Sequence, residues 1–250
     1  MTDTDTLLRG RLRDLDKRAE DRDTYAYSEF LTLAEQELVP TASPVSEWHF
    51  DGGFDGAERK LAVFRGRDCI YEEEPPLCWL HIRPKDPRFA QTLGHRDYLG
   101  ALLNLGIRRE VLGDILTDGN AAYLVCLDTI APFLCENLCK VAHTDVVCSP
   151  VEAPSAASAE LPPLMRVVVA SARLDALVAA VFHLSRSEAQ EYFSRELVAV
   201  NGRPVASFTG EPPEGAIVSV RGKGRFRYEG VSGETRKGRL SAQVRLWGKT

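Results

Sequence analysis

Basic residues concentrate in the last third of this 250-residue chain. Between residues 221 and 239, seven lysines and arginines stand against two glutamates, Glu229 and Glu234. Guanidinium and ammonium groups at this density are suited to binding phosphate oxygens, so a nucleic-acid backbone is the obvious counter-charge. Arg225 and Arg227 should share one face of a strand, because side chains alternate along it. The seven basic residues are Arg221, Lys223, Arg225, Arg227, Arg236, Lys237 and Arg239.

The elements that would position these residues have clear sequence signals. Apolar residues recur at helical spacing from Leu174 to Val181, and Ser185 followed by Glu188 is the signature of a capping box that starts a second helix. Asn201–Gly202 supplies the positive φ angles of a tight hairpin. The segment therefore predicts two helices on a small β-sheet. Its strands are expected at 197–200, 217–221, 224–228 and 240–247. A further strand is expected at 165–169, and the sequence leaves open whether it belongs to the central sheet or leads into this C-terminal segment.

Charge is divided unevenly along the chain. The formal net charge is −5, yet residues 164–250 hold 14 Lys and Arg against 8 Asp and Glu, so residues 1–163 carry −11. This division favours one docking face for nucleic acid over a chain that coats it non-specifically. The start MTDTDTLLRGR lacks the apolar stretch of a signal peptide, and no run of about 18 apolar residues could span a membrane. We expect a cytoplasmic protein with reduced cysteines, no membrane partner and no cofactor.

The sequence predicts an α+β protein in which a central segment alternates strands and helices. That segment reads strand, helix, strand, strand, helix, strand, which is the ferredoxin-like plan shared by RRM-type domains. The N-terminal domain, at 1–74, is predicted to be helical and turn-rich, with helices at 3–22 and from Ser28 to Pro40. A ferredoxin-like (RRM-like) middle domain is predicted at 75–148. A Pro/Ala/Ser linker at 149–163 then leads to a C-terminal domain at 164–250.

RRM sheets stack bases on aromatic residues in two signature strands. The corresponding strand here, 121–126, carries only Tyr123, so base stacking on this sheet is not expected. A longer helix is predicted from Thr129 to Ala142, where Cys135, Cys139 and His143 would form one row. A zinc site needs four compactly placed ligands and only Cys148 follows nearby, so no metal is expected and packing is the default role of these residues.

His95, Arg96 and Asp97 match the catalytic triplet of protein kinases. A kinase also needs an asparagine five residues after that aspartate for magnesium, and Leu102 stands there. We therefore expect His95 and Arg96 to cap or orient a helix, or to touch RNA.

Longer motifs resemble known families. The segments RLDALVAAVFHLSRSEAQEYF, LVAVNG and EGAIVSVRGKGRF, in this order, resemble the S4 RNA-binding domain. Together with GGFDGAERK and LGHRDYLGALLNLGIRREVLGDIL, they resemble the YlmH family of bacterial RNA-binding proteins from about Phe30 onward. The resemblance implies a helix-pair surface for structured RNA on the large ribosomal subunit, with peptidyl-tRNA in place, and a role in the rescue of stalled nascent chains. No DNA partner is expected, and whether the acidic N-terminal half binds a protein partner is left open.

The RNA contacts that we expect fall into three sets. Those on the helix pair are Arg173, Ser185, Arg186, Ser187, Gln190 and Arg195. Those on the strands and the following loop are Lys223, Arg225, Arg227, Arg236, Lys237 and Arg239. A possible second contact comprises His95, Arg96, Arg108 and Arg109.

Two alternatives differ in class from a binding protein. Pseudouridine synthases also carry S4 domains, and their active-site motif contains the RLD found here at Arg173–Asp175. Only 75 residues follow Asp175 and the S4 pattern uses them, so we expect no catalytic residues and no enzyme. The other alternative, an adaptor whose acidic N-terminal half binds a protein, is compatible with RNA binding and stays open.

Overall fold

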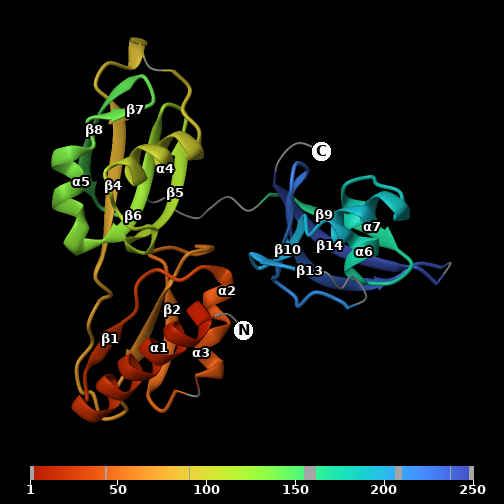
Figure 1. Cartoon of the computed structure of the whole chain (residues 1–250), viewed down its shortest axis with the longest axis horizontal. Coiled ribbons are helices and arrows are strands. Elements are labelled where there is room, and N and C mark those ends of the chain that lie inside the picture. Colours follow the sequence, from red (N-terminus) through yellow and green to blue (C-terminus); the bar gives the residue numbers. More distant parts are fainter. Residues whose placement is uncertain are drawn as a thin grey trace. The chain divides into compact units, whose positions relative to one another are not determined.

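The computed structural model describes residues 3–42, 44–89, 91–154, 162–205, 210–236 and 238–247. It forms two compact units, Met1–Ala159 and Glu160–Thr250. Each unit combines helices with antiparallel sheets, which confirms the α+β class (Figure 1). No helix among the described residues is long and apolar enough to cross a membrane.

The first part of unit 1 is a helix packed on a small sheet. Helix α1 (Asp3–Arg22) forms as predicted, and its Leu12 and Ala19 pack against Ala62 and Phe64. The prediction of a helical N-terminal domain is corrected, because three strands are also present in the order β1-β3-β2. Strand β3 is buried and pairs with a short strand on each side. The sequences of these two short strands mix polar and aromatic residues without a clear alternation of polar and apolar side chains, so the pattern did not predict them. These strands are β1 (Tyr25–Tyr27), β2 (Glu47–Asp51) and β3 (Leu61–Arg65).

The second predicted helix starts later than Ser28 and is split into α2 (Leu33–Gln36) and α3 (Leu38–Thr41). Thr32, with Glu35, forms the capping box of α2. Ser28 has another role: its hydroxyl accepts a hydrogen bond from the Ala62 N–H at 2.8 Å and donates one to the Glu29 carbonyl at 2.7 Å. Ser28 thus links the segment after β1 to β3. Because its hydroxyl is used in this link, it does not cap a helix.

A five-stranded antiparallel sheet follows, in the order β5-β6-β4-β8-β7. Two helices, α4 and α5, lie on one face of it (Figure 1). Leu80 and Ile82 of the sheet are fully buried against Tyr98, Leu102 and Leu134 of these helices. The elements are β4 (Leu77–Pro84), η1 (Pro87–Phe89), α4 (His95–Asn104), η2 (Arg109–Val111), β5 (Leu112–Asp118), β6 (Ala121–Leu127), η3 (Asp128–Ile130), α5 (Ala131–Asn137), β7 (Lys140–Val141) and β8 (Thr144–Val151).

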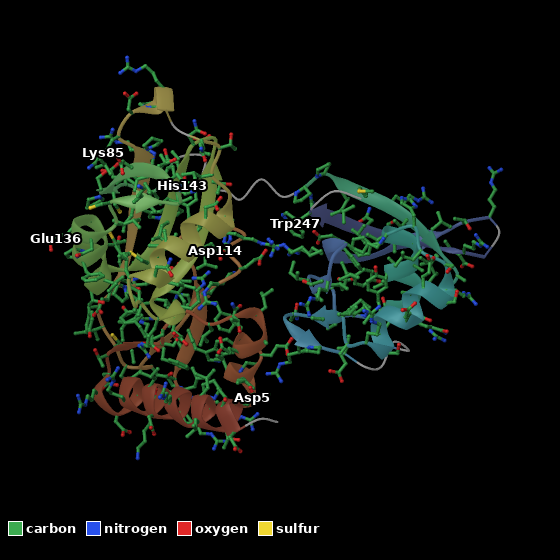
Figure 2. The ribbon with its side chains drawn as sticks, turned by 45° about the horizontal axis from the view of Figure 1, so that its top comes forward. Asp5, Lys85, Asp114, Glu136, His143 and Trp247 are labelled. Carbon is green, nitrogen blue, oxygen red and sulfur yellow. The ribbon has the colours of Figure 1, made fainter. Side chains whose placement is uncertain are left out.

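The long helix predicted to reach Ala142 ends at Asn137. Leu138 leaves the helical region with ψ 81°, and β7 and β8 then form a hairpin whose turn holds Ala142 at φ 49°. Figure 2 shows Glu136 on α5 and His143 on this separate hairpin. The predicted row of Cys135, Cys139 and His143 therefore does not form. In the part of the chain that the structure describes, no three His, Cys, Asp or Glu residues are grouped to hold a metal ion.

The predicted boundaries at 74/75 and 148/149 also change. Trp79 and Val125 of the five-stranded sheet share a core with Tyr25, Phe30 and Leu61, so the first two predicted domains form one unit. Strand β8 continues to Val151 and takes the first residues of the predicted linker. Residues 155–161 of that linker lie outside the described residues.

Unit 2 is a six-stranded antiparallel sheet, in the order β11-β10-β12-β13-β14-β9, with two helices on one face (Figure 1). Leu177 and Phe193 of the helices pack against Phe226, Tyr228 and Val244. The pairing of β9 with β14 places that strand in this unit. The elements are β9 (Leu164–Val169), α6 (Leu174–Val181), α7 (Arg186–Ser194), β10 (Val198–Val200), β11 (Arg203–Pro204), β12 (Ile217–Val220), β13 (Gly224–Glu234) and β14 (Leu240–Trp247).

Candidate nucleic-acid interface

Helix α7 starts with the reciprocal capping box that the sequence predicts. The Glu188 N–H donates to Ser185 Oγ at 3.2 Å, and the Ser185 N–H donates to the Glu188 carboxylate at 2.7 Å. The hydrogen bonds from Ser185, with a smaller contribution from nearby Lys223, hold the pKa of Glu188 below its ordinary value. The capping box uses the only carboxylate of this turn, while Arg186 and Ser187 stay exposed beside it.

We call Ser185, Arg186, Ser187, Gln190 and Lys223 the helix-side surface. The first four lie at the start of α7 and are exposed, and Lys223, in the β12–β13 turn, is near enough to Glu188 of the same helix to contribute to its lowered pKa. Guanidinium, ammonium, hydroxyl and helix N–H groups of this kind donate charge-assisted hydrogen bonds to the phosphate oxygens of a nucleic-acid backbone. The surface therefore has the chemistry to position folded RNA.

Arg173 and Arg195 have partners within the protein. Arg173 precedes α6 and donates to both oxygens of Asp175 at 3.1 Å. Arg195, just after α7, lies 3.3 Å from Glu191 one turn earlier, and both side chains are exposed. Such exposed pairs are weak and exchange readily with other anions. A phosphate that approaches either arginine must therefore share it with a nearby carboxylate or displace that carboxylate.

Arg225 and Arg227 lie on the other face of the sheet. Phe226 and Tyr228 are fully buried under the helices, so the residues that alternate with them point away from α6 and α7. The strand register sets Arg227 opposite Arg245 on β14. The thickness of the sheet therefore separates these arginines from the exposed residues at the start of α7.

We call this second face of unit 2 the open sheet face. Glu229 accepts a hydrogen bond from Arg245 at 2.7 Å and lies 3.7 Å from Arg227. The guanidinium of Arg225 lies over the ring of Trp247, 5.3 Å from its centroid. Figure 2 labels Trp247 at the end of β14. Among the residues of this face that the structure describes, four arginines stand beside one carboxylate, so positive charge is in excess. The residues of the open sheet face are Arg166, Arg225, Arg227, Glu229, Gln243, Arg245 and Trp247.

The remaining basic residues of this segment lie at the far end of the β13–β14 hairpin. Arg236 and Arg239 are exposed in a turn closed by the Thr235 N–H, which donates to the Arg239 carbonyl at 2.7 Å. Lys237 lies outside the described residues. Strand rise places this turn about 30 Å from Arg225. Five of the clustered positions, Lys223, Arg225, Arg227, Arg236 and Arg239, are thus spread over three sites in space.

In unit 1, the four residues expected to form a second RNA contact have different surroundings. His95 and Arg96 are exposed in the first turn of α4, where Asp97 accepts the bond from the Gly94 N–H at 2.8 Å. Asp97 thus caps this helix. Arg108 is largely exposed and ion-paired with Glu29.

Arg109 has a structural position. Its guanidinium donates to the carbonyls of Leu112 and Gly113 at 2.6 and 2.9 Å, and burial lowers its pKa to about 10. Arg59, two residues before β3, donates to the carbonyls of Leu112 and Phe30, both at 2.9 Å. The motif around Arg109 therefore joins the two sheets of unit 1.

Three similarities to known proteins accompany this geometry. Residues 80–154, from β4 to beyond β8, match the family model described as "Putative RNA-binding domain in YlmH". The chain is 29% identical over 214 residues to ribosome-associated protein quality control protein P2 of Bacillus subtilis (strain 168), covering 84% of this chain and 82% of that protein. It also resembles a solved structure, cell division protein ylmH from Streptococcus pneumoniae, with a TM-score of 0.48 and 20% identity over 60% of this chain and 93% of that chain. The first two matches support the resemblance to YlmH-type proteins.

Proposed function

We propose that the protein is a YlmH-type RNA-binding protein that docks on structured RNA of the large ribosomal subunit and catalyses no reaction. In this proposal, unit 2 is an S4 domain and the five-stranded sheet of unit 1 is a ferredoxin-like domain. The bound RNA is ribosomal RNA with peptidyl-tRNA, during rescue of stalled nascent chains. The match of residues 80–154 to an RNA-binding domain and the name of the Bacillus subtilis relative support this assignment.

The helix-side surface is the observation that carries the proposal. Arg186 and Lys223 outnumber the one carboxylate of this turn, Glu188, which caps the helix through the Ser185 N–H, so a local positive surplus remains. Hydroxyl and amide groups of Ser187 and Gln190 lie beside these charges and are exposed. RNA recognition by shape uses phosphate and 2′-hydroxyl contacts of this kind. Folded RNA presents such groups in a fixed geometry.

The position of Asp175 favours binding over base modification. Its carboxylate accepts two hydrogen bonds from Arg173 and one from the Ala176 N–H at 2.9 Å, at the start of α6. A carboxylate that attacks a base must be free to approach it. In this protein the RLD segment serves as a helix start.

Sedimentation of native lysate at low salt tests the proposal. We expect the wild-type chain to migrate with large ribosomal subunits, and the double variant Arg186→Ala, Lys223→Ala to shift toward the top of the gradient. The matched control is Lys17→Ala, Arg18→Ala, which removes two exposed charges from α1. Wild-type protein found only in the top fractions would refute the ribosomal assignment.

A second measurement separates binding from catalysis. Ribosomal RNA incubated with the protein is digested and analysed by mass spectrometry for pseudouridine. We expect no increase over RNA incubated alone. A yield that grows with incubation time and disappears in Asp175→Asn would establish the synthase alternative.

A further inference from the structure

Two aromatic rings meet on the five-stranded sheet of unit 1. His81 on β4 and Tyr123 on β6 are directly opposite in the strand register. Their ring centroids are 4.6 Å apart and their planes differ by 9°, which is a stacked pair. Both side chains are half-buried. The strand holding Tyr123 has one aromatic residue, but the neighbouring strand supplies the second.

The pair lies on the sheet face that the helices do not cover. Leu80 and Ile82 are fully buried under α4 and α5, so Trp79, His81 and Arg83 point to the opposite side. The N-terminal sheet covers this side over Trp79, which is 7% exposed. Two residues farther along β4 the cover ends, because His81 is half-buried and Arg83 is exposed.

The neighbours of the pair make its two sides unequal. On β5, Leu116 stands opposite Tyr123 and packs in the same apolar cluster. On β8, Ser149 stands opposite His81. Serine is the smallest side chain in this row, so the outer face of the imidazole has more room than the outer face of the phenol. A planar group can therefore extend the stack on the histidine side.

A cationic side chain lies on the same strand face as the pair. Arg83 lies two residues from His81 on the same strand face, and no ion pair among the described residues involves it. A planar ring beside a free guanidinium matches a nucleotide, whose base stacks while its phosphate accepts charge-assisted hydrogen bonds. All four residues, His81, Arg83, Tyr123 and Ser149, lie within the segment that matches an RNA-binding family model.

We propose that His81, Tyr123 and Arg83 bind one unpaired nucleotide of an RNA strand. The base lies against the imidazole of His81 above Ser149, and the phosphate pairs with Arg83. Stacking of this kind tolerates any base, because every base has a π-face. The inference rests on the proposed function in that it assumes an RNA ligand, and it adds a single-stranded site on unit 1 to the structured-RNA surface of unit 2.

The test uses the full-length chain and a short single-stranded oligoribonucleotide that carries 2-aminopurine, whose fluorescence falls when it stacks on an aromatic ring. His81→Ala and Tyr123→Leu should each weaken binding by about fivefold to a hundredfold, the range for loss of one stacking partner. Tyr123→Phe keeps the ring and should bind like the wild type. The matched control, His49→Ala, removes an exposed histidine from β2.

Several outcomes would overturn the inference. They are a wild-type chain that does not quench the probe, unchanged affinity in both His81→Ala and Tyr123→Leu, or unchanged affinity in Arg83→Ala. Arg83 is exposed, so its substitution tests the site without disturbing the core. Failure of the proposed function has a different signature. If the chain quenches the fluorescence of the probe but does not sediment with ribosomes, the nucleotide site is supported and the ribosomal assignment is rejected. If the chain sediments with ribosomes but does not quench the probe, only the nucleotide site is rejected.

Discussion

Phe30 packs its ring against the backbone of Gly113. A Cβ at residue 113 would lie 2.8 Å from Cε1 and 2.9 Å from Cζ of that ring. Phe30 is fully buried, and its N–H donates to the Glu110 carbonyl at 2.8 Å. This contact joins the N-terminal sheet to β5, and it explains why a glycine occurs in the LGDIL segment.

Gly113→Ala should lower the free energy of unfolding by about 1–3 kcal/mol, because the added methyl overpacks the buried Phe30 ring. Urea denaturation measures this loss. The matched control is Gly100→Ala in α4, where a Cβ would meet nothing within 4 Å. There the substitution should stabilise the protein by about 0.5–1 kcal/mol through helix propensity. Equal effects at both positions would contradict the packing argument.

Arg109 and its neighbour Arg108 should respond differently to substitution. Arg109→Met should cost about 1.5–3 kcal/mol of stability, because two buried carbonyls lose a charged donor. Arg108→Ala should leave stability within about 0.5 kcal/mol, as is usual for an exposed residue. Denaturant titration of both variants checks this. Reduced RNA affinity in an Arg109 variant that is still folded would show that Arg109 contacts RNA as well as the two carbonyls.

The two faces of unit 2 can be separated by salt dependence. Each phosphate contact removed should flatten the slope of log K against log salt by about 0.7–0.9. Arg186→Ala with Lys223→Ala tests the helix-side surface, and Arg225→Ala with Arg227→Ala tests the open sheet face. We expect each double variant to flatten the slope by about one to two units. An unchanged slope in one of them would show that its face does not meet RNA.

Acid should weaken the start of α7. The folded-state pKa of Glu188 is lowered by its hydrogen bonds with Ser185, so its carboxylate stabilises the folded state at neutral pH. That stabilisation is lost as pH falls through the lowered pKa. Glu188→Gln should therefore be less stable than the wild type at pH 7, with the difference vanishing in acid. A difference independent of pH, measured by urea denaturation, would rule out this linkage.

The cysteines should differ in reactivity toward iodoacetamide at neutral pH. Burial raises the pKa of Cys126 and Cys148, so little thiolate is available there, whereas Cys139 is exposed. We expect Cys139 to be alkylated first, and the two buried thiols only after unfolding. Mass spectrometry of timed samples resolves the sites. Early labelling of Cys148 would show that β8 opens in the native state.

Local patterns predicted the elements of unit 2 well. The capping box of Ser185 and Glu188 and the Asn201–Gly202 turn involve residues close together in the chain, and both form as expected. In unit 1 the same reasoning failed at Ser28. Its hydroxyl finds a partner in Ala62, and no local pattern contains that distant residue.

Binding surfaces depend on pairings between distant segments. Alternation predicted that Arg225 and Arg227 share a face, but only the packing of Phe226 and Tyr228 under the helices showed which face that is. Likewise, Tyr123 is a single aromatic residue in its own strand, and the register between β4 and β6 sets His81 against it. The sequence by itself determined which residues can bind phosphate or stack on a base, because those properties belong to individual side chains. Tertiary structure decided which of them act together, because strand register and core packing bring residues far apart in the chain into contact.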